Sequence, residues 1–308
     1  MTSTADSDNA DSDNADSDNA AAAAAAPAPD PVRDFAGMTV LITGAARGQG
    51  RSHAVEFARR GATIVAVDLC ADVDTIPYPL ATVDDLDQTR ALVEEAGGRC
   101  LATRADVRDS DRMCEVVDEA VRAFGGVEVC IANAGVVSFA PVVELTDAQW
   151  ATMLDVNLTG AFHTLRAVAP AMTARGWGRI ITVASMGGRA GTPNLGHYSA
   201  AKWGVIGLTK TLALELAGTG VTANIVCPGT VSTDMVHNPA MYSLFAPDMD
   251  SPTREQVRGR YARLNPLGEP WTDPADVTAA VTYLASPAAR HVTGETLEIG
   301  AGVSARMP

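Results

Sequence analysis

The feature that most constrains the fold is a regular alternation of short apolar runs with amphipathic segments from residue 38 onward. The runs are mostly apolar, and most of them lack a strict alternation of apolar with polar residues. Such runs are typical of parallel strands that are buried on both faces of a sheet. Because strand–helix–strand crossovers are almost always right-handed, the pattern predicts an α/β fold with a doubly wound, mostly parallel sheet and helices on both faces.

The expected elements follow from this alternation and from the capping residues. Seven strands are expected, at 38–43, 63–67, 99–105, 127–132, 179–184, 221–226 and 296–299. Helices are expected from the first turn to Arg59 and at 86–95, 109–124, 147–175, 197–216 and 273–285, with a kink or break in the fourth near Gly160 and Pro170. Asp109 and Asp273 are expected N-caps, the latter followed by a proline. We expect 69–84 to be a loop and 233–270, with five prolines, to be an irregular substrate loop.

The first 33 residues differ from the rest of the chain. The unit Ala-Asp-Ser-Asp-Asn occurs three times between residues 5 and 19, and an alanine run and three prolines follow it. Seven acidic residues and no basic residue precede Arg33, so this segment carries half of the net charge of −14. It has too little apolar surface to offset the entropy lost on ordering. We therefore expect a disordered, low-complexity tail at 1–33 and one folded domain at 34–308.

Charge and composition narrow the possible function classes. The folded part is mildly acidic, which argues against nucleic acid as a partner. No apolar run reaches the length of about 18 residues that a membrane span needs, and the acidic start lacks the basic region of a signal peptide. The five cysteines show no paired spacing. We expect a cytoplasmic protein without a metal site.

A glycine-rich turn joins the first expected strand to the first expected helix. It consists of Gly44, Arg47, Gly48, Gln49 and Gly50 with two alanines between the first two. Glycines let the backbone approach a pyrophosphate, and the helix N-terminus adds free N–H groups and the positive end of its dipole. A lone turn of this kind can also be purely structural. Its position between a strand and a helix predicts a dinucleotide site.

Asp68 indicates which dinucleotide is bound. It ends the second expected strand, 18 residues after Gly50. A carboxylate there accepts hydrogen bonds from the adenosine ribose and repels a 2′-phosphate, so NAD is favoured over NADP. Arg47 points the other way, because a cation in the turn would suit a 2′-phosphate; we give Asp68 more weight. Further cofactor contacts are expected after the second, third and fourth strands, from Leu69, Asp106, Val107, Asn133, Ala134 and Gly135.

Tyr198 and Lys202 lie four residues apart in an expected helix, so their side chains share one face. Lys202 is one of only two lysines, against 21 arginines, which suggests a role that arginine does not fill. A cation about 4–5 Å from a phenol supplies about 4 kcal/mol at an effective dielectric near 20, enough to lower a pKa of about 10 by two to three units. Lys202 would then prepare Tyr198 to act as a general base. The alternative is an ordinary surface pair.

Together these motifs resemble the short-chain dehydrogenase/reductase family, whose fold is of the Rossmann type. The resemblance covers residues 36–303 and rests on motifs in a fixed order: the glycine turn, Asp68, Asp106, Asn133-Ala134-Gly135, Asn157, Ser185, Tyr198-x-x-x-Lys202 and Pro228-Gly229. It implies that Asn157, Ser185, Tyr198 and Lys202 are the catalytic residues. Ser185 would hold the substrate oxygen, and Asn157 would bind a water that relays the proton past Lys202.

The resemblance also implies contacts with the nicotinamide end of the cofactor and an assembly. The cofactor residues implied after the sixth strand are Pro228, Gly229, Val231 and Thr233, of which Thr233 matches the position that binds the nicotinamide carboxamide region. Tyr198 and Lys202 belong to this set as well. Family members are commonly homotetramers that pair the helices at 147–175 and 197–216.

A narrower resemblance is to the subgroup of carveol dehydrogenases and other mycofactocin-associated oxidoreductases. It rests on the turn continued by Arg51-Ser52-His53, on a long insertion after Asp68 that contains Ile76-Pro77-Tyr78-Pro79, and on the segment 193–198. In that subgroup the insertion covers a nicotinamide cofactor that is not readily exchanged. Mycofactocin, a peptide-derived redox carrier, is then the partner that re-oxidises it.

The residues around the expected cleft are mostly apolar, which predicts a hydrophobic secondary alcohol or ketone of terpenoid, steroid or aryl carbinol type. The expected pocket residues are Val137, Met186, Leu195, Met235 and Met241. Apolar walls select shape rather than identity, so the molecule is not named. One alternative is an NADPH-dependent 3-oxoacyl-type ketoreductase, against which Asp68 and the insertion argue. The other is a nicotinamide-binding sensor, against which the complete catalytic set argues.

Overall fold

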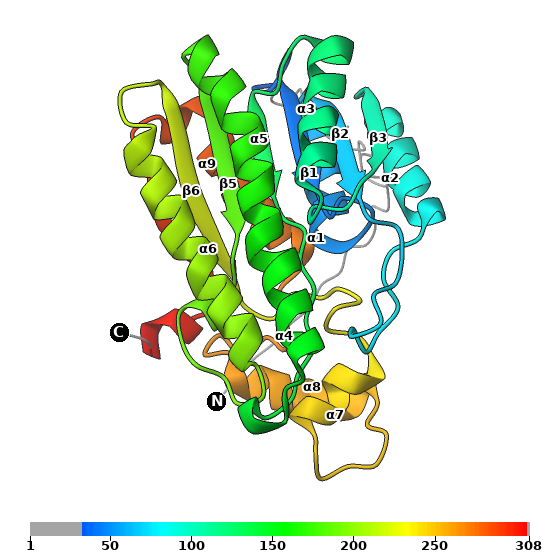
Figure 1. The fold of residues 1–308 in the computed structure, drawn as a ribbon. Helices are drawn as coiled ribbons and strands as arrows, with labels where there is room; N and C mark the ends of the chain where they lie inside the picture. Colours follow the sequence, from blue (N-terminus) through cyan, green and yellow to red (C-terminus); the bar gives the residue numbers. More distant parts are fainter. Residues whose placement is uncertain (1–32, 307–308) are drawn as a thin grey trace, which may run out of the picture. The chain divides into compact units, whose positions relative to one another are not determined.

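The protein is described here by a computed structural model that covers residues 33–306. Within these residues a seven-stranded sheet has the order β3-β2-β1-β4-β5-β6-β7, and all neighbouring strands run parallel (Figure 1). The strands are β1 (Thr39–Thr43), β2 (Thr63–Asp68), β3 (Cys100–Arg104), β4 (Val129–Ala132), β5 (Gly178–Val183), β6 (Val221–Pro228) and β7 (Thr296–Ile299). The predicted doubly wound fold is confirmed. The predicted tail, except for residue 33, lies outside the described residues.

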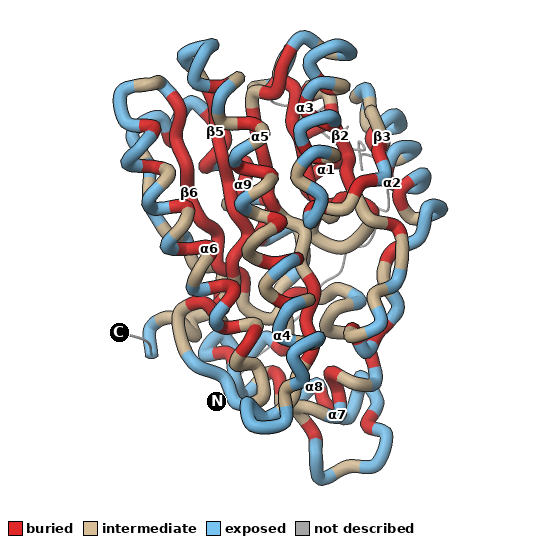
Figure 2. Tube along the Cα trace, in the orientation of Figure 1, coloured by how far each residue is buried: buried red, intermediate tan, exposed pale blue. Residues whose placement is uncertain are grey.

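Helices cover both faces of the sheet. One layer contains α1 (Gly48–Arg59), α2 (Val83–Glu95) and α9 (Pro274–Ala285), and the other contains α3 (Ser110–Phe124), α5 (Gly160–Arg175) and α6 (Gly196–Glu215). The second layer lies in front of the sheet in Figure 1. Because helices lie on both sides, every residue of the inner strands β1, β4, β5 and β6 is buried (Figure 2). This double burial explains why the sequence shows mostly apolar runs at the strands.

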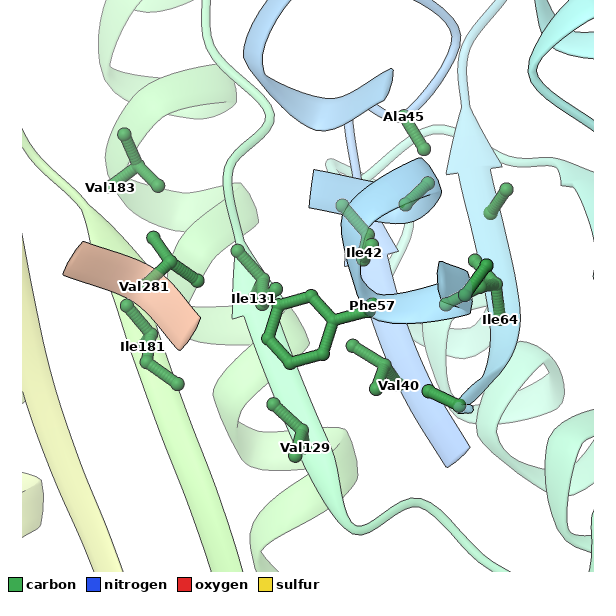
Figure 3. Close-up of a cluster of buried hydrophobic side chains, with 14 of the residues drawn as sticks. Val40, Ile42, Ala45, Phe57, Ile64, Val129, Ile131, Ile181, Val183 and Val281 are labelled. Atoms are coloured by element: carbon green, nitrogen blue, oxygen red, sulfur yellow. The ribbon is translucent and has the colours of Figure 1, made fainter. Parts of the chain in front are cut away.

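The core between the sheet and the first helix layer combines aliphatic side chains with the paired rings of Phe35 and Phe57. Phe57 of α1 is fully buried and lies among Val40, Ile42, Ile131 and Val281 (Figure 3). Because strand residues and helix residues meet in one cluster, the position of α1 relative to β1 is fixed by packing. This packing fixes the turn between β1 and α1, which belongs to the candidate site.

The segment predicted to be irregular, 233–270, instead contains two helices, and that prediction is wrong. These are α7 (Pro239–Phe245) and α8 (Arg254–Leu264), which lie beyond the carboxyl ends of the strands (Figure 1). Asn238 caps α7 by accepting a hydrogen bond from the N–H of Met241, and Thr253 caps α8. Proline favours the first turn of a helix, so Pro239 starts α7 and does not prevent it.

The long helix predicted at 147–175 consists of two α-helical parts joined by a wider turn. After α4 (Asp147–Leu154), residues Asp155–Thr159 adopt a π-helical conformation and α5 follows from Gly160. The predicted irregularity near Gly160 is confirmed, whereas α5 continues through Pro170. Four short 3₁₀ segments complete the described elements: Val142–Glu144, Met186–Gly188, Pro287–Ala289 and Val303–Arg306.

Two predicted helix starts are confirmed and one lies earlier than expected. The Asp109 carboxylate accepts hydrogen bonds from two N–H groups of α3, and Asp273 forms a capping box with Asp276. Thr82 forms a capping box with Asp85, so α2 begins three residues before the predicted start. None of the helices within 33–306 is both long and apolar enough to cross a membrane. The same residues contain no cluster of three or more potential metal ligands.

The core packing predicts different effects for the same substitution at two helical valines. Val281 is fully buried beside Phe57, whereas Val121 of α3 is 39% exposed. Val281→Ala is expected to lower the free energy of unfolding by about 2 kcal/mol through lost burial and a residual cavity. Val121→Ala should have almost no effect. Urea denaturation followed by circular dichroism measures both, and equal losses would contradict the packing described here.

Candidate active site

The predicted site residues converge at the carboxyl ends of the strands. The glycine turn follows β1, Asp68 ends β2, Asn133 follows β4 and Ser185 follows β5. The strand order reverses between β1 and β4, and such a switch point leaves a crevice at the sheet edge. This edge faces α7 and α8 in Figure 1. The fold therefore brings together groups that are far apart in the sequence.

The turn after β1 is too tight for side chains at its glycines. Gly44 has a φ of +66°, and a Cβ at Gly50 would lie 2.0 Å from the Gly44 carbonyl oxygen. A Cβ at Gly48 would lie 3.2 Å from Cγ2 of Thr233. Backbone N–H groups at the start of α1 thus stay close to the crevice, as anion binding requires.

Asn133 connects the end of β4 to the turn after β1. Its Nδ2 donates to the carbonyl oxygens of Thr43 at 2.9 Å and Gly44 at 3.1 Å. In return, Oγ1 of Thr43 accepts the N–H groups of Asn133 and Ala134, each at 3.1 Å. These four hydrogen bonds hold the two strand ends on either side of the crevice together, so Asn133 does more than form a turn.

The Asp68 carboxylate is anchored at one end of the crevice. Oδ2 accepts the N–H of Ala46 at 3.0 Å, and Oδ1 accepts the N–H of Cys70 at 3.2 Å. The carboxylate therefore has a fixed orientation and is only partly buried, and the residue lines the main cavity. A charge at this position can accept hydrogen bonds from a ribose and disfavours a second anion.

Two adjoining cavities account for most of the predicted cofactor residues. The larger cavity is lined by Gly44, Arg47, Gly48, Gln49, Asp68, Leu69, Asp106, Val107, Asn133, Ala134, Gly135 and Thr233. The smaller one is lined by Ser185, Tyr198, Pro228, Gly229 and Val231. Gln49, Thr233 and Met235 border both, so the cavities form one elongated site. Gly50 and Lys202 line neither cavity, although each lies next in the structure to residues that do.

The elongated site fits a nicotinamide dinucleotide. Its cradle depends on glycines whose Cβ would clash with neighbouring backbone. Oε1 of Gln49 is buried without a hydrogen-bond partner in the described part of the chain, so an acceptor is available inside the site. Asp68 lies at one end and Tyr198 at the other, as a cofactor with separate adenosine and nicotinamide ends requires.

Arg47 makes protein contacts that the sequence does not indicate. Nη2 donates to the carbonyl oxygen of Pro79 at 2.7 Å, and Nη1 lies 3.3 Å from Oδ2 of Asp234. The guanidinium is thus shared between the insertion and the segment before α7. Because its charge is paired with a carboxylate, Arg47 gives little support to the NADP alternative.

Tyr198 and Lys202 lie on one face of α6, as predicted. Nζ of Lys202 is 5.7 Å from the centroid of the Tyr198 ring and donates to the Val183 carbonyl oxygen at 2.9 Å. Lys202 is only 4% exposed, and this burial lowers its pKa to about 8. The surface-pair alternative is therefore excluded for this lysine.

The expectation that Lys202 alone lowers the pKa of Tyr198 is wrong in the cofactor-free protein. Burial raises the pKa of Tyr198, and hydrogen bonding with the Ser185 hydroxyl opposes this rise. Burial also weakens the ammonium, because it lowers the pKa of Lys202. Desolvation penalises the charged form of both groups. Additional positive charge in the site would favour ionisation of the phenol.

Asn157 lies in the π-helical turn, and its side chain is used for structure. Oδ1 accepts the Val136 N–H at 3.3 Å, while Nδ2 donates to the carbonyl oxygens of Val136 and Met153, each at 3.0 Å. Both N–H groups of the amide are thus used within the protein, so a relay water at this side chain would have to donate to Oδ1, and the relay role stays a prediction. A Cβ at Gly135 would lie 2.8 Å from Oδ1 of Asn157 and 3.4 Å from Nζ of Lys202.

The predicted substrate residues do not all lie together. Val137, Leu195, Met235 and Met241 belong to the same apolar cluster as Tyr198. Met186 instead packs in a separate cluster, where a Cβ at Gly300 would lie 3.1 Å from its Sδ, so its prediction as a pocket residue is wrong. Met186 begins the 3₁₀ segment that follows Ser185, and its cluster includes Ile225 and Cys227 of β6.

Several residues that line the site were not predicted from the sequence, and two of them have polar side chains, Tyr78 and Asp234. Both line the larger cavity. The hydroxyl of Tyr78 accepts the N–H of Val137 at 3.1 Å, and Asp234 pairs with Arg47. The prolines on either side of Tyr78 were the available signal, because they stiffen the chain around it.

Comparisons with known proteins agree with this geometry. Residues 38–241 match the family model described as short chain dehydrogenase. (-)-trans-Carveol dehydrogenase of Rhodococcus erythropolis is 43% identical over 272 residues, 87% of this chain and 98% of that protein. Carveol dehydrogenase of Mycobacterium avium, solved in complex with NAD, is 40% identical with a TM-score of 0.86, covering 88% of this chain and 98% of that one.

A second solved structure, a short chain dehydrogenase of Mycobacterium paratuberculosis bound to NAD, is 35% identical with a TM-score of 0.81 and covers 88% of this chain and 99% of that one. The family model, the relatives and the crevice at the switch point of the sheet lead to one conclusion: this chain belongs to the short-chain dehydrogenase family.

Proposed function

We propose that the protein is an NAD-dependent dehydrogenase that transfers a hydride between NAD and a hydrophobic secondary alcohol or ketone of terpenoid, steroid or aryl carbinol type. One observation carries the proposal: Tyr198, beside the buried Lys202, borders the same elongated site that Asp68 lines at its other end. The apolar cluster around Tyr198 favours a hydrophobic substrate. The likeness to carveol dehydrogenases supports the same class.

The proposal extends to the fate of the cofactor and to the assembly. The insertion lines the larger cavity through five residues, which favours retained NAD that a mycofactocin-type carrier re-oxidises: Ala71, Val73, Tyr78, Leu80 and Ala81. A cytoplasmic homotetramer is part of the proposal. Trp150 on α4 and Trp203 and Leu214 on α6 are exposed apolar side chains on the helices expected to pair. The catalytic unit is assigned to 34–308, with 1–33 as a tail.

In the proposed reaction, Tyr198 takes the proton from the substrate hydroxyl, and the Ser185 hydroxyl holds that oxygen in place. NAD, when bound, accepts the hydride from the carbinol carbon. Lys202 favours the phenolate by its charge. In the reverse direction, Tyr198 donates the proton to the carbonyl oxygen. The Ser185 hydroxyl oxygen also accepts a hydrogen bond from the N–H of Gly187 at 3.0 Å.

Asn157 is proposed to be a positioning residue. Its side chain fixes Val136, which follows the Asn133–Gly135 segment beside the cofactor cavity. The lack of a side chain at Gly135 lets Asn157 and Lys202 come close to this segment. The arrangement keeps the ammonium near the proposed nicotinamide end and shields it from water.

The first test compares wild-type protein with Tyr198→Phe. Wild type is expected to oxidise hydrophobic secondary alcohols with an artificial electron acceptor, and kcat should fall at least about a thousandfold in the variant because the proton acceptor is lost. NAD released on denaturation should be the same in both. Tyr283→Phe, at a 46% exposed position, is the control. Activity limited to small polar alcohols would contradict the substrate class, and a variant as fast as wild type would contradict the role of Tyr198.

The pH dependence tests the role of Lys202. Oxidation requires the phenolate, so kcat/KM should rise with pH. A cation near the ring contributes about 3 kcal/mol at an effective dielectric near 20, so Lys202→Met should move this rise by about two pH units to higher pH. The difference should be largest below pH 8, because the pKa of Lys202 is about 8 and the ammonium is charged below it. Superimposable profiles would exclude an electrostatic role.

Asp68→Ala tests the cofactor preference. The substitution removes the carboxylate that would bind the ribose and repel a 2′-phosphate, so the ratio of NAD to NADP affinity should fall by at least about tenfold. Calorimetry with both dinucleotides measures the ratio, and the exposed Asp84→Ala provides the control. An unchanged ratio in Asp68→Ala would argue against the assignment of this residue.

A further inference from the structure

Arg47 makes polar contacts with two segments that line the larger cavity, the insertion and the segment before α7, and the same two segments also meet in one apolar cluster. Its guanidinium donates to Pro79 of the insertion at 2.7 Å and pairs with Asp234 at 3.3 Å. Arg47 itself belongs to the glycine turn, whose position is fixed by the packing of α1 against the sheet. Arg47 thus adds a polar link, from a rigid base, between two segments that are distant in sequence.

Asp234 is in turn connected to α7 by hydrogen bonds. Its carbonyl oxygen accepts Nδ2 of Asn238 at 2.9 Å, and Oδ1 of Asn238 caps α7 through the N–H of Met241 at 2.8 Å. Met241 packs in the apolar cluster that includes Tyr198. A movement of Asp234 therefore changes both the wall of the cofactor cavity and the apolar surface near the proposed base.

The insertion has a second anchor on the opposite side. Tyr78 is 6% exposed, and its hydroxyl accepts the Val137 N–H at 3.1 Å. Prolines precede and follow this residue, so the backbone on both sides has few alternative conformations. Within the insertion, the Leu80 N–H donates to Oδ1 of Asp72 at 2.7 Å. The insertion is therefore attached to the rest of the protein at Pro79, which contacts Arg47, and at Tyr78, which contacts Val137.

We propose that Arg47 and Asp234 fasten the insertion and the segment leading to α7 into a single lid, so that the dinucleotide leaves only when both parts open together. Arg47 and Asp234 are then positioning residues whose pairing sets the rate of cofactor exchange. The inference rests on the proposed retention of NAD and identifies the contacts that produce it. Opening of the lid would also move Met241, so cofactor release and substrate access are linked.

The test measures release of NADH from the loaded protein. NADH fluorescence is followed after a chase with excess NAD, for wild type, Asp234→Asn and Asp248→Asn. Asp248 is a matched control because it is also 63% exposed and also pairs with an arginine, Arg260, but does not line the cavity. An exposed ion pair has a modest effect, so Asp234→Asn should speed release up to about fivefold. Asp248→Asn should release NADH at the wild-type rate.

Whether Asp234→Asn speeds or slows NADH release distinguishes loss of the lid contact from a direct effect of charge on the bound dinucleotide. Asp234 lines the cavity, so loss of its negative charge would by itself attract a pyrophosphate and slow release. The lid predicts faster release. Added salt should speed release from wild type more than from Asp234→Asn, since screening weakens the Arg47–Asp234 ion pair only where that pair exists. Release from Asp234→Asn that is equal to or slower than wild type would overturn the proposal, as would equal acceleration in Asp248→Asn.

Tyr78→Phe supplies an independent measurement at the other anchor. The ring is kept, but the Val137 N–H loses its acceptor, so NADH release should be about tenfold faster. The melting temperature of each cofactor-free variant checks that folding is intact. These results are distinguishable from failure of the proposed function: wild type that binds NADH without oxidising any alcohol contradicts the substrate proposal only. Unchanged release in both Tyr78→Phe and Asp234→Asn contradicts the lid.

Discussion

The buried ammonium of Lys202 is the constraint on which the site depends. A charged group that is 4% exposed is unfavourable unless it is satisfied, and the structure gives it one hydrogen bond, to Val183 at the end of β5. Its pKa of about 8 reflects the free-energy cost of burying the charged form. A negative phenolate at Tyr198 would offset part of that cost, so the two groups stabilise each other's charged forms. The sheet end, α6 and the absent side chain at Gly135 all serve to hold this pair.

The fold could be predicted because the inner strands are buried on both faces. β1, β4, β5 and β6 have no exposed residue, so each leaves a mostly apolar run in the sequence, although β5 includes the buried Arg179 and β6 the buried Asn224. Local capping chemistry was equally visible, as at Asp109 and Asp273. The helices α7 and α8 were missed because prolines were taken as helix breakers. At Pro239 the proline occupies the first turn, where its missing N–H has no consequence.

For the candidate site, residue types at strand ends were predictable, whereas their partners were not. Asp68 and Asn133 could be placed because parallel strands end at one edge. The Tyr78–Val137 and Arg47–Asp234 contacts join segments distant in sequence, and no local pattern indicates such pairs. Met186 was misassigned because an apolar residue after a strand looks the same whether it faces the pocket or the core. The family membership is confirmed, while the residue roles stay proposals.

The central claim is that Tyr198 ionises readily once the positive charge of NAD joins that of Lys202. The direct measurement is an ultraviolet titration of tyrosinate absorbance in the NAD complex, with the spectrum of Tyr198→Phe subtracted. The account predicts one tyrosine that titrates well below its ordinary pKa of about 10 in the complex, and above that value in the cofactor-free protein, where burial raises it. A difference signal at or above pH 10 in the presence of NAD would contradict the account.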